Sequence, residues 1–367
     1  MSVRAVLVVT FLALAPQAAM SATAWIKQTS RPAISYCGDV YAPPFANPLD
    51  AGRRSCPPAE ARAYTPRHRG IGFDILDLES EACFVPDESY RLLDDVIDEV
   101  ASRLSAHRGP ARAQSAVALD IATVTGEVMA ARGFGLYVPT ETLGDALARR
   151  SGNAEPPRYV FDCDTGSMIL MTVAENLSLP ASLVEITLRS GSGHNYVRWE
   201  FGGESTVDWD MNGRQQCLTP RDVRPYQVRR SMTRDEVLGY AYLLRAALWK
   251  QSSKIAKEID DLREATRRRP DHPAAYNNLA WLIATRDLPN PGSLQAEALR
   301  GAEKAVAIER HPNYLDTLAC VHAAGGRFEE AARIEREAAE KAPEQETYKR
   351  RVEQFEAAMP RDCRGED

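Results

Sequence analysis

The apolar residues in the first half of the chain follow the period of a helix. Between Asp87 and Leu104 they recur every three or four residues, with acidic residues on the opposite side, which predicts an amphipathic helix. Residues 114–132 predict a second helix that ends at Gly133. Residues 25–70 are rich in Pro, Arg and Ala and keep no sustained period. We therefore expect an irregular arm there, followed by helices.

A further helix is predicted to begin at Cys163. Asp162 at the N-cap position and Asp164 in the first turn complement the positive end of the helix dipole, and Pro180 follows as a stop signal. The thiol therefore lies in the first turn, on the side that faces the core. One apolar stripe carries this prediction, formed by Cys163, Ser167, Leu170, Ala174 and Leu177.

Three strands are predicted after this helix. Alternating and β-branched residues cover Ser182–Leu188, His194–Phe201 and Thr206–Asp210, and clusters of Gly and Ser between them indicate tight turns. We expect a three-stranded antiparallel meander. Residues 217–226 contain Pro and Arg and are expected to form a connector.

From Thr233 onward the pattern is helical again, and it repeats. The segments Tyr276–Thr285 and Tyr314–Pro343 place large, leucine and small residues at the offsets of a tetratricopeptide repeat, and a degenerate unit runs from Tyr242 to Pro270. Small residues at the crossing points let helices approach closely, and about three units are needed to bury a continuous core. This resemblance covers residues 233–345. It implies a helical solenoid whose groove binds a peptide or protein, with a capping helix over residues 346–358.

These patterns predict an α+β fold, a helical subdomain plus an antiparallel sheet, followed by an all-α helical-repeat domain. A chain of 367 residues is long enough for two domains. We expect a signal peptide over residues 1–24, the irregular arm over 25–70, the sheet-containing domain over 71–230 and the repeat domain over 231–360.

The N-terminus has the features of a secretory signal peptide. One charged residue, Arg4, precedes an apolar run from Ala5 to Ala15 and a small-residue site at residues 22–24. The run is too short to span a membrane comfortably, and no later stretch could span one. We therefore expect an exported protein, periplasmic or secreted, without a membrane span.

The number of cysteines bears on the expected disulfides of an exported protein. There are seven cysteines, and in an oxidising compartment an odd number leaves at least one free or paired with another molecule. If Cys163 is the free one, six remain for up to three disulfides, of which Cys37 with Cys56 is the most local. Cys320, in a predicted repeat helix, is the alternative unpaired cysteine.

Cys163, His194 and an acid on the following strand are the candidate catalytic residues. A helix N-terminus lowers the pKa of a thiol, whereas two flanking aspartates raise it. His194 opens the middle predicted strand and is suited to take the thiol proton near neutral pH. Asp208 and Asp210 share a face of the next strand. Asp210 is farther from the turn and hence nearer to His194, so it is the preferred partner and Asp208 the alternative.

This arrangement resembles the transglutaminase-like superfamily, relatives of the papain-type thiol enzymes, over residues 90–215. Members place the nucleophile where the sequence CDTGS begins here, and they end an apolar helix in a turn like that at residues 178–180. Many also carry an aromatic residue two positions after the histidine, as Tyr196 is. The resemblance implies a Cys-His-Asp triad that performs acyl transfer or amide hydrolysis through a thioester. No cofactor or metal is expected.

Two alternatives remain open. Residues 208–213 match the first half of a calcium loop, D-x-D-x-N-G, although Thr219 occupies the place of the bidentate Glu. The second hypothesis for the whole protein is an exported adaptor without turnover, which binds a protein or peptide through its repeats. A net charge of −6 argues against a general nucleic-acid binder.

Overall fold

The structure is a computed structural model. The predicted signal peptide, most of the predicted arm and the cysteines Cys37 and Cys56 lie outside the part of the chain that it describes. That part comprises residues 35–36, 62–106, 112–136, 142–148, 157–187, 193–202, 205–213, 215–218, 227–286, 288, 291–358 and 363.

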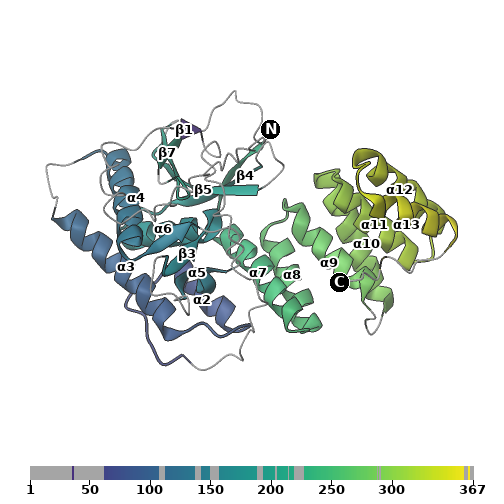
Figure 1. The fold of residues 1–367 in the computed structure, drawn as a ribbon, viewed down its shortest axis with the longest axis horizontal. Helices are drawn as coiled ribbons and strands as arrows, with labels where there is room; N and C mark the ends of the chain where they lie inside the picture. Colours follow the sequence, from purple (N-terminus) through teal and green to yellow (C-terminus); the bar gives the residue numbers. More distant parts are fainter. Residues whose placement is uncertain are drawn as a thin grey trace, which may run out of the picture.

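The described residues form an α+β fold whose larger sheet has six strands (Figure 1). The strand order is β1-β7-β6-β5-β4-β8, and all neighbours are antiparallel except β1 and β7. The strands are β1 (Ser35–Tyr36), β4 (Ser182–Thr187), β5 (Gly193–Glu200), β6 (Thr206–Asp210), β7 (Gln215–Leu218) and β8 (Gln227–Met232).

The prediction of a three-stranded meander was incomplete. Strands β4, β5 and β6 form the centre of the sheet as expected, but β7 and β8 flank them. Strand β7 includes Cys217 and Leu218, which were predicted to belong to a connector. Its sequence, QQCL, has no clear alternation of apolar and polar residues. Pairing with β6 therefore defines this strand, and its own sequence pattern does not.

Helix α6 (Cys163–Asn176) packs against β5 and lies at the centre of the first region. Leu170 of α6 belongs to the same buried core as Val197, Trp199 and Trp209 of the sheet. A two-stranded parallel sheet, β2 (Phe134–Leu136) with β3 (Tyr159–Phe161), leads into α6. The remaining helices of this region are α2 (Ile71–Ser80), α3 (Asp87–Ser105), α4 (Gln114–Ala131) and α5 (Leu143–Leu147).

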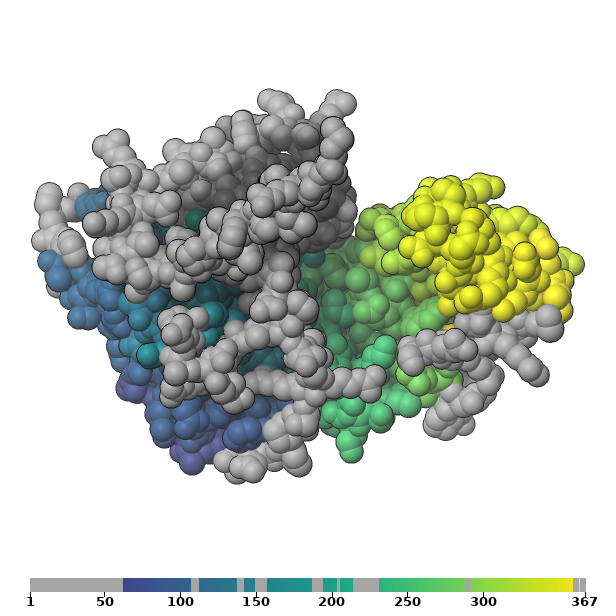
Figure 2. All heavy atoms as spheres, viewed as in Figure 1, coloured from purple at the N-terminus to yellow at the C-terminus, as the bar shows by residue number. Residues whose placement is uncertain are grey.

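The C-terminal half is helical, and each helix packs against the next. Figures 1 and 2 show it as a lobe that runs from green to yellow beside the sheet region. Fully buried alanines, among them Ala280, Ala302, Ala319 and Ala331, let these helices approach closely. Its helices are α7 (Arg234–Gln251), α8 (Ile255–Arg268), α9 (Pro273–Thr285), α10 (Pro291–Ile308), α11 (Pro312–Ala324), α12 (Phe328–Lys341) and α13 (Glu346–Glu356).

Helix α7 belongs to both regions. Val237 and Ala241, in its first half, are part of the core of the sheet region, whereas Ala246 belongs to the core of the helical region. Between them Arg245 donates to both carboxylate oxygens of Asp261 on α8, each at 2.7 Å, and to the carbonyl oxygen of Leu78 on α2 at 3.0 Å. The two regions therefore share one helix and a buried ion pair.

Two features of the described chain bear on the sequence predictions about cysteines and membranes. Cys320 forms a disulfide with Cys363, so the alternative that Cys320 is the unpaired cysteine was wrong. Cys83 is also disulfide-bonded. Across the described residues, every helix is either too short or too polar to cross a membrane.

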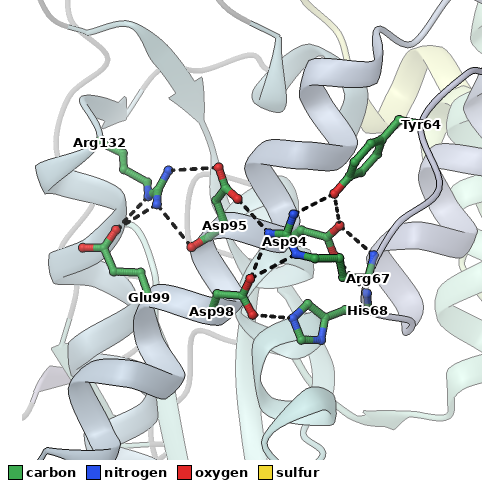
Figure 3. A network of polar contacts seen from close by, with 8 residues as sticks. All are labelled: Tyr64, Arg67, His68, Asp94, Asp95, Asp98, Glu99 and Arg132. Carbon is green, nitrogen blue, oxygen red and sulfur yellow. Dashed lines mark hydrogen bonds and ion pairs between the residues drawn. The ribbon is translucent and has the colours of Figure 1, made fainter.

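The last residues of the predicted arm pack on α3 through a polar network (Figure 3). The buried carboxylate of Asp94 accepts from the backbone N–H groups of Arg67 and His68, at 2.8 and 3.0 Å, and from the Tyr64 hydroxyl at 2.7 Å. His68 Nε2 lies 2.7 Å from Asp98 Oδ1. These contacts fix the chain as it enters α2. The remaining members of the network are Asp95, Glu99 and Arg132.

Candidate functional site

Asp162 determines where α6 begins. Its carboxylate accepts from the backbone N–H groups of Asp164 and Thr165, at 3.1 and 3.0 Å, and Thr165 Oγ1 accepts from the Asp162 N–H at 3.0 Å. This capping box satisfies N–H groups that a first helical turn leaves without intrahelical partners. The prediction that Asp162 is the N-cap is confirmed, and the cap places Cys163 at the first helical position.

Cys163 carries a free, partly buried thiol. Its Sγ donates to Asp164 Oδ1 over 3.4 Å. Burial raises the pKa of the Cys163 thiol well above its usual range, and the negative charges of Asp164 and Asp162 raise it further, whereas a hydrogen bond from the backbone N–H of Asn195 lowers it. Burial and the two acids outweigh the helix N-terminus, so the thiol is held in its protonated form.

Asp164 is held by two further donors. The Asn195 side-chain amide donates to Oδ1, the same oxygen that accepts from the thiol. The Tyr240 hydroxyl donates to Oδ2 over 2.5 Å. Burial raises the pKa of Tyr240 well above its usual range, and the charge of Asp164 raises it further, so the phenol stays protonated as this hydrogen bond requires.

His194 and Asp210 form a buried pair. His194 Nε2 lies 3.0 Å from Asp210 Oδ2, and the two residues are 2% and 1% exposed. The other oxygen, Asp210 Oδ1, accepts from the Asn212 backbone N–H at 2.9 Å. Because a carboxylate only accepts, the neutral ring carries its proton on Nε2 and keeps a lone pair on Nδ1. Nδ1 is buried, and among the described residues it has no hydrogen-bond partner.

Asp208 has a different partner. Its two oxygens accept from Arg198 Nε at 2.7 Å and from Arg198 Nη2 at 2.8 Å, in a fork-like arrangement. Arg198 also donates to the Tyr196 hydroxyl at 2.8 Å. Tyr196 and Arg198 therefore share a face of β5. Of the two acids, the structure places Asp210 beside the imidazole.

The candidate residues meet around the beginning of β5, and one contact is absent. The thiol of Cys163 lies against the backbone N–H of Asn195, the residue that follows His194. Within the described residues, no hydrogen bond joins the sulfur to the ring, because Nδ1 has no partner and the thiol donates to Asp164. The imidazole–carboxylate pair is assembled, and the thiol is held beside it by other groups.

Sequence reasoning did not find the surroundings of the thiol. Asn195 was passed over as one more residue of a predicted strand. Tyr240 is 76 residues from Asp164 along the chain, on a helix that was predicted to belong to the repeat domain. Asp164 was recognised only through its effect on the helix dipole and the thiol. No local pattern links a tyrosine at that distance to the start of α6.

The described residues contain no group of three or more His, Cys, Asp or Glu side chains placed to hold a metal ion. In the segment that matches half a calcium loop, Asp208 is bound by Arg198, and Asp210 is bound by His194 and the Asn212 N–H. These two carboxylates are therefore engaged by protein donors in the arrangement observed.

Comparisons with known proteins add no assignment: no protein-family model matches the chain, and no curated protein matches it.

Proposed function

We propose that this protein is an exported transglutaminase-like thiol enzyme that transfers or hydrolyses an acyl group of a protein or peptide. The observation that carries the proposal is the buried His194–Asp210 pair, whose free Nδ1 lies on the strand that contacts the Cys163 thiol. A buried polar atom without a partner costs about 1–3 kcal/mol and is uncommon for that reason. A thiol proton is a partner that this nitrogen could accept.

In the proposed reaction, Cys163 turns from Asp164 towards the ring and its S–H proton passes to Nδ1. The thiolate attacks an amide carbonyl, a C–S bond forms, and the C–N bond breaks as the imidazolium returns the proton to the leaving amine. Water or a second amine then releases the acyl group from the thioester. Asp210 keeps the ring in the required tautomer and stabilises its cationic form. Backbone N–H groups near the start of α6 would stabilise the oxyanion.

The helical region is proposed to resemble tetratricopeptide repeats and to bring the protein or peptide substrate to the site. Support comes from the repeated sequence pattern and from the fully buried alanines in the core of successive helices. No cofactor takes part in the proposed reaction.

The test uses casein as acyl donor and a fluorescent alkylamine as acceptor. Amine incorporation and peptide-bond cleavage are followed together by mass spectrometry, so that transfer and hydrolysis are distinguished. We expect Cys163→Ala to abolish turnover and His194→Gln to reduce it by at least about 10²-fold. Turnover that survives Cys163→Ala would overturn the proposed mechanism.

A second candidate function is supported by the state of the thiol. Burial and two acids keep Cys163 protonated, and its hydrogen bond goes to Asp164. These features suit an adaptor that keeps the fold without turnover and binds a protein or peptide partner through its helical region. An absence of turnover in the casein assay would favour the adaptor.

A further inference from the structure

Three donors converge on the carboxylate of Asp164. The Cys163 thiol and the Asn195 amide donate to Oδ1, and the Tyr240 hydroxyl donates to Oδ2. These donors come from α6, β5 and α7. A side chain at the second position of a helix needs none of these bonds to serve the helix dipole, and the capping role is already performed by Asp162. These hydrogen bonds therefore indicate that Asp164 acts on the Cys163 thiol.

Tyr240 is packed against the C-terminal end of α8. The guanidinium of Arg269, at the C-terminal end of α8, lies over its ring, with Cζ 5.7 Å from the centroid. Arg269 in turn donates to Glu185 on β4 at 2.7 Å. At Gly239, the neighbour of Tyr240, an added Cβ would approach Arg269 Cγ to 2.9 Å, so α7 and the end of α8 are in close contact. Helical residues that follow the sheet region thus fix the position of the phenol.

We propose that Asp164 is a positioning residue that holds the Cys163 thiol away from His194 in a resting orientation, and that Tyr240 holds Asp164 for this task. The proposal rests on the proposed thiol chemistry and adds two residues to it. The first helix of the helical region would then complete the site, so this region is more than a module for holding substrate.

The physical reason lies in competition for one proton. The thiol can donate to Asp164 or to Nδ1 of His194, but not to both. While it donates to Asp164, the neighbouring negative charge opposes formation of a thiolate. Tyr240 and Asn195 share this charge through their own hydrogen bonds and keep the carboxylate aimed at the sulfur. A change that weakens the hydrogen bond between the Cys163 thiol and Asp164, or that lets the Asp164 carboxylate move, frees the thiol to turn towards the His194 ring.

The test measures the pH dependence of iodoacetamide alkylation of Cys163 in the full chain, quantified on the peptide that contains it. Asp164→Asn keeps the shape of the side chain and removes its charge. We expect the midpoint of the alkylation profile to fall by about one pH unit or more, which corresponds to about tenfold faster alkylation at pH 7. A profile that superimposes on that of the unaltered protein would overturn the proposal.

Tyr240→Phe removes only the hydroxyl. Asp164 then loses one of the donors that keep its carboxylate aimed at the sulfur, so the thiol is freed more often and we expect alkylation at pH 7 to become about two- to threefold faster. Tyr242→Phe is the matched control, because Tyr242 lies on the same helix and its ring contacts Arg245 and Arg268. The control profile should stay unchanged. Equal effects of the two phenylalanine variants would contradict the role of Tyr240.

The double variant separates positioning from general packing. Because Tyr240 is proposed to act through the charge of Asp164, Tyr240→Phe should change alkylation no further once Asp164→Asn is present. Additive effects would contradict the proposal. Alkylation needs no substrate, so these results are independent of whether the casein assay shows turnover. Thermal unfolding of each variant establishes that the comparison is made on folded protein.

Discussion

The sheet region and the helical region bury different kinds of side chain, and the difference shows where chemistry is possible. Between α6 and the sheet, the core is filled by large residues such as Trp199 and Trp209, each 1% exposed. In the helical region, alanines such as Ala302 and Ala319 are fully buried in the core. Large residues set a sheet and a helix apart, and polar groups at their edge can remain buried between them.

The buried polar groups differ in the same way. The sheet region holds a free thiol and an imidazole nitrogen without a partner close to one strand. In the helical region, Asp261 is joined to Arg245, and Asp316 is joined to Arg351. The buried carboxyl of Glu335, whose pKa is raised by burial, stays protonated. Among the described residues, the free thiol is that of the sheet region, and it lies against β5, the strand that carries the imidazole. The proposed thiol chemistry therefore belongs to the sheet region, with α7 as the link between the two regions.

The largest effect is expected at Asp210, which keeps the proton of the neutral His194 ring on Nε2. Asp210→Asn can donate to Nε2 and thereby place the ring proton on Nδ1, which then cannot accept the thiol proton. We expect turnover of casein to fall on the order of 10³-fold. Asp208→Asn is the matched comparison, since Asp208 pairs with Arg198, and it should reduce turnover far less. A larger loss of turnover from Asp208→Asn than from Asp210→Asn would mean that Asp208 is the acid that orients the His194 ring.

The next largest effect is expected on stability, at Arg245 of α7, which joins the sheet region to the helical region. Arg245→Ala leaves Asp261, 3% exposed, without its guanidinium partner, and also removes the contact with Leu78 on α2. We expect the free energy of unfolding, measured by urea titration, to fall by about 3–5 kcal/mol. The control is Arg310→Ala, which removes the exposed pair with Glu337 and should cost less than about 1 kcal/mol. Equal losses would mean that the joint contributes little.

A pH-dependent effect should arise within the helical region. Burial raises the pKa of Glu335, and the charge of Asp316 raises it further. The folded state therefore keeps Glu335 protonated while the unfolded state ionises it, so stability falls as pH rises above the ordinary carboxylate range. Glu335→Gln stays neutral, and we expect it to unfold with roughly 1–3 kcal/mol more free energy at pH 8 and with little difference at pH 4. Glu330→Gln, an exposed position on the same helix, should show no such pattern.

The smallest effect is expected in the exposed part of the network of Figure 3. Hydrogen bonding from His68 lowers the pKa of Asp98, with help from Arg67. Asp98 therefore contributes stability above the pKa of an unfolded aspartate, and this contribution is lost as pH falls through the lowered value. We expect Asp98→Asn to cost about 0.5 kcal/mol at pH 7 and less at pH 3, measured by urea titration. A cost that grows towards acid would contradict this assignment.

Much of the fold followed from local pattern. The predicted strand Thr206–Asp210 is β6, and the helix predicted to start at Cys163 is α6. The period of apolar residues in a helix or strand depends on which face is buried, so it can be recognised in the sequence. Strand β7 was not predicted because four residues with no clear alternation are defined only by their neighbours.

The site was predictable in part for the same reason. Counting from the turn between two antiparallel strands placed Asp210 nearer to His194 than Asp208, and the structure has the pair at 3.0 Å. The partners of the thiol could not be counted in this way. Tyr240 reaches Asp164 only because α7 packs beside the sheet region, and no spacing along the chain records that contact.

By itself, the sequence determined the helices, the central strands, the capped start of α6 and the identity of the candidate thiol, imidazole and carboxylates, because each depends on residues close together along the chain. Only the tertiary structure decided that the thiol donates to Asp164, that Asp208 belongs to Arg198, and that a helix from the second region reaches the first. Those outcomes depend on competition among donors and acceptors from distant segments, which is resolved only when the chain is packed.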